Sequence, residues 1–173
     1  MALQTKLASL LKFSITLLLL GSSLLMANRT ANDELISKIL QAADLRNANA
    51  PEIQSGLISN QITVQKQAIL ALGRIGDPKT IKSLSAFLYS PQPEIRALTA
   101  YALAISENNR AVPFLINRLK TEKSANVIAE ILPAIGLLGP SDDSPDIIAV
   151  ILRYLDDESK QVVSASCDAL TYA

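Results

Sequence analysis

The sequence predicts an all-α fold: a right-handed α-solenoid of about four helical hairpins, preceded by an N-terminal signal or anchor helix and one further helix. Four twelve-residue stretches superpose, at 64–75, 95–106, 127–138 and 162–173. Alanine recurs within them at positions 71, 102, 134 and 169, each followed by leucine or isoleucine, with offsets of 31, 32 and 35 residues. Repeats of this length are typical of helix pairs that stack and bury their apolar faces on their neighbours.

Composition supports a helical core built from small aliphatic side chains. Hydrophobic residues make up 49% of the 173 residues and aromatic residues 4%, and there is no Trp. The single cysteine, Cys167, excludes an intramolecular disulfide. Its equivalents in the other repeats are Ile69, Ala100 and Leu132, so we expect Cys167 to be a small packed hydrophobe.

Residues 1–27 have the pattern of a signal peptide or membrane anchor. Lys6 and Lys12 precede an apolar run over residues 13–27, which is short for a membrane-spanning helix. Cleavage is expected after Ala27 or after Ser23, and the alternatives are an uncleaved anchor or a buried helix of the fold. A signal or anchor places the repeats outside the cytoplasm, in the periplasm or cell envelope, with attachment to the inner membrane if the segment is retained.

Residues 28–50 are expected to form a helix and a linker ahead of the repeats. Leu35, Ile39 and Ala43 lie on one stripe at helical spacing within 32–46, so this helix can shield the first repeat. Thr30 or Asn32 is the expected N-cap. The linker is 47–50.

The solenoid is expected over 51–173, with units of about 51–76, 77–107, 108–140 and 141–173. The first hairpin combines a weak helix at 51–59 with a strongly amphipathic one at 62–75, which Gly76 ends as a C-terminal cap. Asp77-Pro78 is predicted to open the next helix, and Ser144-Pro145 to repeat that arrangement. Gly139-Pro140 is predicted to end the third unit as Gly76 ends the first.

The first helices of the later hairpins align as well. Their expected buried positions are Ile81, Leu84 and Leu88, then Val112, Leu115 and Leu119, then Ile148, Ile151 and Leu155. Pro133 lies inside the second helix of the third unit, where proline removes a backbone hydrogen bond and predicts a kink.

Several segments resemble HEAT repeats of the short bacterial kind. They are VQKQAILALGRIGDPKTIKSLSAFL at 64–88, PEIRALTAYALA at 93–104 and AVPFLINRL at 111–119. The ALGRIGD stretch at 71–77, followed by proline, carries most of the resemblance. Tetratricopeptide and ankyrin repeats fit less well, because the sequence has no Trp and no TPLH motif.

A narrower resemblance covers ILQAADLRN at 39–47 and the repeat that follows it. This part is similar to the N-terminal region of exported bacterial proteins in which HEAT repeats precede a cyclophilin-type peptidyl-prolyl isomerase domain. That resemblance implies an isomerase barrel downstream, none of whose catalytic residues lies in this sequence. The last predicted helix reaches residue 173 without the polar capping unit that usually closes a solenoid, so we expect the solenoid to continue beyond it. A HEAT-like bilin lyase subunit is a further alternative.

The sequence offers no catalytic, cofactor-binding or metal-binding constellation. Histidine is absent and no glycine-rich phosphate loop is evident. The zero net charge argues against a nucleic-acid partner, and membrane contact is expected only through residues 1–27. We therefore predict a scaffold that binds a protein partner or a downstream domain of the same chain.

The expected binding surface is the exposed side of the second helix of each hairpin. Its candidate residues are Gln65, Lys66, Arg74, Arg96 and Glu130. Arg96 has an alternative role, in which it joins two repeats by binding an acidic loop residue such as Asp77.

Overall fold

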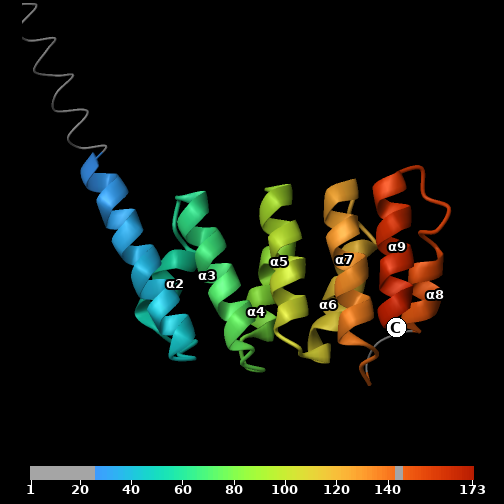
Figure 1. Cartoon of the computed structure of the whole chain (residues 1–173), viewed down its shortest axis with the longest axis horizontal. Coiled ribbons are helices and arrows are strands. Elements are labelled where there is room, and N and C mark those ends of the chain that lie inside the picture. Colours follow the sequence, from blue (N-terminus) through green and yellow to red (C-terminus); the bar gives the residue numbers. More distant parts are fainter. Residues whose placement is uncertain (1–25, 143–145) are drawn as a thin grey trace, which may run out of the picture.

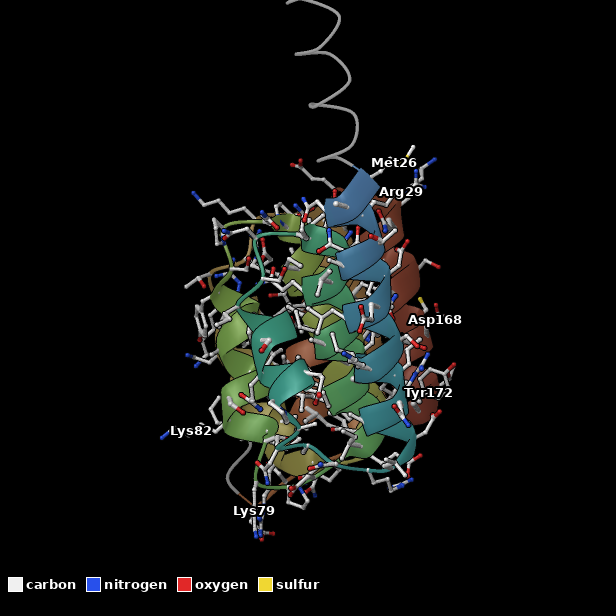
Figure 2. All side chains as sticks on the ribbon, turned by 90° about the vertical axis from the view of Figure 1, so that its left-hand side faces the viewer. Met26, Arg29, Lys79, Lys82, Asp168 and Tyr172 are labelled. Carbon is white, nitrogen blue, oxygen red and sulfur yellow. The ribbon has the colours of Figure 1, made fainter. Side chains whose placement is uncertain are left out.

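The computed structural model describes residues 26–142 and 146–173, and these residues form two layers of helices (Figures 1 and 2). Four long helices stand side by side in chain order and form what we call the inner layer: α3 (Ile62–Ile75), α5 (Pro93–Ile105), α7 (Ala125–Leu138) and α9 (Lys160–Tyr172). The outer layer contains α2 (Pro51–Leu57), α4 (Ile81–Ser85) with η1 (Ala86–Tyr89), η2 (Asn109–Ala111) with α6 (Val112–Leu119), and α8 (Ile147–Leu152). The predicted α-solenoid is confirmed.

The expected helix ahead of the repeats is present and is helical throughout the described residues 26–44. Thr30 and Asn32 therefore lie inside the helix, and the prediction that either caps its start is wrong. The Thr30 hydroxyl instead donates to the carbonyl of Ala27, one turn earlier. The rest of the predicted signal or anchor, residues 1–25, lies outside the described residues.

The first helix is fixed to the repeats at Gly56 of α2. A Cβ atom at Gly56 would lie 2.7 Å from Cδ1 of Ile39 and 2.8 Å from Cβ of Ala68. Three helices thus meet where only glycine leaves enough room, and Ile39 is fully buried there. Within residues 26–142 and 146–173, no helix has both the length and the apolar character required to cross a bilayer.

Small residues set the close spacing of the inner layer. The four aligned alanines, at positions 71, 102, 134 and 169, are buried. A Cβ at Gly73 of α3 would lie 2.6 Å from the carbonyl oxygen of Ala102 in α5. Gly136 of α7 faces the carbonyl oxygen of Ala169 in α9 even more closely. Backbone therefore packs against backbone at two of the three interfaces between inner helices.

Gly76 ends α3 as predicted. Its φ of 64° and ψ of 24° lie in the left-handed region, and its N–H donates to the carbonyl of Leu72 at 3.1 Å. Asp77 does not cap a helix beginning at Pro78. Its carboxylate accepts from the N–H of Lys79 at 2.9 Å within a turn, and α4 begins only at Ile81.

The third unit ends differently from the first. Gly139 also has a positive φ, of 68°, but its ψ is −175°, so the chain leaves α7 in another direction than it leaves α3. Ser144 and Pro145, predicted to open the fourth unit, lie outside the described residues. Asp146 caps α8, accepting from the N–H groups of Ile148 at 3.0 Å and Ala149 at 3.3 Å.

The expected outer-layer core positions of the second and third units are buried, as is Ile151 of the fourth, whereas Leu155 is half-buried and the prediction for Ile148 is wrong. Ile147 and Ile151 point into the core, whereas Ile148 is 46% exposed. The Asp146 cap fixes where α8 begins and so determines which isoleucine faces inward. The helix α7 continues through Pro133 without interruption, and the kink stays a prediction.

Cys167 is exposed, so the prediction of a packed hydrophobe is wrong. Its equivalents Ile69, Ala100 and Leu132 are fully buried. Their helices are flanked on both sides: α5 and α7 each lie between two inner helices, and α3 has α5 on one side and the first helix, near Ala68, on the other. In the described residues, α9 has an inner-layer neighbour, α7, on one side only.

Candidate protein-binding surface of the inner layer

Arg96, predicted as an exposed binding residue, is buried at 9% exposure, so that prediction is wrong. Its Nε and Nη2 atoms each donate to Glu122, in the turn between α6 and α7, at 2.8 Å. Its Nη1 donates to the carbonyls of Ser90 and Pro91 at 3.0 and 3.2 Å. The alternative prediction, that Arg96 joins two repeats by binding an acidic loop residue, is confirmed. That residue is Glu122 and not Asp77.

Glu122 is the centre of a buried network of charged groups. Arg118, one turn earlier, donates to it at 2.6 Å, and the backbone N–H groups of Lys123 and Ser124 donate at 2.9 Å. Burial by itself raises the pKa of this carboxyl, but the hydrogen bonds from Arg96, Ser124, Arg118 and Lys123 outweigh burial and lower the pKa to about 2. The network joins two hairpins and leaves none of these carboxylate oxygens free for a partner.

Two other candidates also connect hairpins or helices. The side-chain amide of Gln65 donates to the carbonyl of Leu57 at 2.9 Å and so ties α3 to the end of α2. Lys66 of α3 and Glu94 of α5 form an ion pair at 2.6 Å on the surface. The hydrogen bond from Lys66 and its positive charge lower the pKa of Glu94. A partner protein that contacts Lys66 therefore also meets the carboxylate of Glu94, which neutralises the charge of the lysine.

The remaining two candidates, Arg74 of α3 and Glu130 of α7, are exposed. They do not lie together: Glu130 lines a depression between inner helices, and Arg74 lies outside it. Of the five candidates, Lys66 and Glu130 share one depression.

One face of the inner layer points away from the outer layer, and we call it the free face. It carries two adjoining depressions, which together we call the Tyr101 groove. The smaller one, of about 250 Å³, is lined by Lys66, Glu94, Ala97, Leu98, Tyr101 and Glu130. The larger one, of about 480 Å³, is lined by Tyr101, Ala104, Ile105, Glu107, Leu137 and Leu138. Tyr101 lines both depressions, which are therefore two halves of one site.

The larger half of the groove has two prominent apolar side chains. Tyr101 is 48% exposed and Leu137 57% exposed, on the adjacent helices α5 and α7. In the repeat alignment Leu137 corresponds to Ile105 and to Tyr172. Figure 2 shows Tyr172 and Asp168 of α9 on the side of the array opposite Lys82 of α4, which places this row of positions on the free face of the inner layer.

Sequence reasoning missed Tyr101 and Leu137 because it searched the free face for polar residues. A signal for them existed. Both stand outside the buried alanine–leucine stripe of their helices, and apolar residues at such positions have no place in the core. Among the described residues, no group of three or more Cys, Asp or Glu is arranged to hold a metal ion.

Stacked hairpins with one continuous interior and a free helical face define a helical repeat scaffold. The family model for HEAT repeats matches residues 50–136, and the chain belongs to the HEAT-repeat family. HEAT repeats commonly mediate interactions between proteins.

A curated relative is condensin complex subunit 3 of Schizosaccharomyces pombe. It is 27% identical over 138 residues, which is 75% of this chain and 16% of the relative. This chain therefore spans about a sixth of the length of the relative that it matches.

Proposed function

We propose that this chain is an exported scaffold that binds a protein partner through the free face of its inner layer, centred on the Tyr101 groove. The observation that carries the proposal is the pair of half-exposed apolar side chains, Tyr101 and Leu137, lining one depression of about 480 Å³. Large apolar groups gathered in a depression lose water on binding and typically contribute most to the affinity of an interface.

The surroundings of the groove support this role because they fix the positions of α5 and α7, the helices that form its walls. Gly136 brings α7 into backbone contact with α9, and the Arg96–Glu122 pair holds α5 against the turn that precedes α7. A groove with rigid walls does not have to order its own side chains and helices when a partner binds, which favours affinity.

The similarity to a condensin subunit also supports a scaffold role. That relative is named as a subunit of a complex, and the matched region covers most of this chain. The two enzymatic alternatives, an isomerase barrel downstream and a bilin lyase subunit, stay predictions, since neither comparison bears on them.

Site-specific photocrosslinking in the native host tests the proposed surface. Benzoylphenylalanine replaces Leu137 on the inner layer or, as a matched control, Ile148 on the outer layer, which is an apolar residue of similar exposure. We expect crosslinked products with other proteins from position 137 and few from position 148. Equal crosslinking from the two positions, or more from 148, would place the interaction elsewhere.

The exported location is a separate proposal that rests on Lys6, Lys12 and the apolar run at 13–27. Alkaline phosphatase fused after residue 173 is active only outside the cytoplasm and reports the location directly. We expect high activity, and loss of activity when Leu18→Arg and Leu19→Arg interrupt the apolar run. Equal activity of the two fusions would contradict export through this segment.

A further inference from the structure

We infer that the Tyr101 groove takes a basic amphipathic helix of the partner protein, with apolar side chains spaced seven residues apart. This inference rests on the proposed function and adds the chemistry of the bound segment. It is carried by the spacing of the two depressions, by the backbone of the groove walls and by the charges at the rim.

The spacing follows from the helix α5. The smaller depression lies beside Ala97 and Leu98, and the larger one beside Ala104 and Ile105. Seven residues of an α-helix span about 10 Å, so two apolar side chains of a partner must be about 10 Å apart to fill both depressions. A helix lying along α5 supplies this distance between positions i and i+7, with position i+3 or i+4 facing Tyr101.

The walls of the groove favour a helical segment over an extended one. An extended segment exposes backbone N–H and C=O groups that need hydrogen-bond partners. The groove walls are the sides of α5 and α7, whose backbone groups are already bonded within those helices. A helix satisfies its own backbone groups and presents only an apolar stripe, which suits walls made of Tyr101, Ile105 and Leu137.

The charges at the rim select a basic partner. Lys66 lines the groove, but Glu94 already neutralises it at 2.6 Å. Glu130 borders the smaller depression and Glu107 the larger one, and no ion pair joins either to a basic side chain in the described part of the chain. Two carboxylates therefore flank the apolar walls, and lysine or arginine beside the apolar stripe of the partner complements them.

Selection from a library of random 16-residue peptides displayed on phage tests this chemistry with the full chain as bait. We expect enriched peptides with a net positive charge and large apolar residues at i, i+3 or i+4, and i+7. Fluorescence anisotropy then measures binding of one enriched peptide. The double variant Glu107→Lys, Glu130→Lys is expected to bind it about tenfold more weakly, and the matched control Asp156→Lys, Glu158→Lys, in the exposed turn after α8, as tightly as the unmodified protein.

The outcomes separate this inference from the proposed function. Acidic or uncharged enriched peptides, no enrichment at all, or binding that is unchanged in the Glu107→Lys, Glu130→Lys variant would overturn the basic helix. Enriched peptides whose apolar residues alternate, two residues apart as in an extended strand, would overturn it as well. The crosslinks expected from position 137 would stand in each of these cases. Enriched peptides that bind Tyr101→Ala as tightly as the unmodified chain would instead show that both proposals point to the wrong surface.

Discussion

Arg96 of α5 holds Glu122, 26 residues later in the chain, through two parallel hydrogen bonds of 2.8 Å in the interior of the array. The two side chains are 10% and 1% exposed. The planar guanidinium matches the two carboxylate oxygens, and this arrangement fixes distance and orientation together. The second hairpin is thereby attached to the turn that begins the inner helix of the third.

Removing the charge of Glu122 should strongly destabilise the protein. Glu122→Gln leaves Arg96 and Arg118 buried without a counter-charge, which costs about 3 kcal/mol in the free energy of unfolding at pH 7. Urea denaturation followed by circular dichroism measures the change. The matched control, Glu130→Gln on the exposed side of α7, should unfold within about 0.5 kcal/mol of the unmodified protein. Equal midpoints for the two variants would contradict the role of the buried pair.

Stability should fall in acid because Glu122 must take up a proton on unfolding. Its pKa is about 2 in the folded protein and about 4.3 in an unfolded chain. The stabilisation, about 3 kcal/mol, is complete above the unfolded pKa and is lost as the pH falls from about 4.3 towards 2. Unfolding measured between pH 7 and 2 should show the unmodified protein and Glu122→Gln converging across this range. A constant difference between them would contradict the lowered pKa.

A charge at two leucines of the inner layer should change the stability of the protein to very different extents. Leu72→Asp puts an unpaired carboxylate into a fully packed position and should cost more than about 4 kcal/mol, enough to unfold the array. Leu137→Asp introduces the same group at a half-exposed position of the Tyr101 groove and should leave the melting temperature nearly unchanged. Thermal melts of the two variants check the predicted register. A melt of Leu72→Asp near that of the unmodified protein would contradict it.

Alanine at Gly73 should destabilise the protein although alanine favours helices. Helix propensity alone predicts a gain of about 1 kcal/mol from Gly73→Ala. The added Cβ would lie 2.6 Å from the backbone oxygen of Ala102, so α3 and α5 must move apart, at a cost of about 1–3 kcal/mol beyond that gain. Ala104 occupies the equivalent position of α5, and Ala104→Gly should show only the ordinary propensity loss. A higher melting temperature for Gly73→Ala would mean that the helices separate freely.

The fold could be predicted from the sequence because the residues that specify it recur periodically along the chain. The alanines at 71, 102, 134 and 169 and their leucine or isoleucine neighbours recur every 31 to 35 residues, and each lies in a buried contact of the inner layer. A stripe of apolar residues specifies which side of a helix is buried without reference to the rest of the chain. The HEAT resemblance rested on the same stripe and is confirmed.

The candidate site was predicted less well because polar side chains carry no such periodic signal. Whether Arg96 faces water or the interior depends on where the turn containing Glu122 lies, 26 residues away. The position of Ile148 likewise depends on Asp146, which sets the start of α8. Arg118 and Glu122 are four residues apart, a spacing that predicts an ion pair, but the sequence does not reveal that Arg96 joins them.

The position of the Arg96–Glu122 pair has a mechanical consequence. In a linear array each hairpin contacts only its neighbours, so tension applied to the two ends is carried by every interface in series. The interface between the second and third hairpins has a desolvated bidentate pair in addition to its apolar contacts. Under load, separation of these two hairpins has to break the ion pair as well as the apolar contacts, and it leaves two charged groups to be rehydrated in the same step.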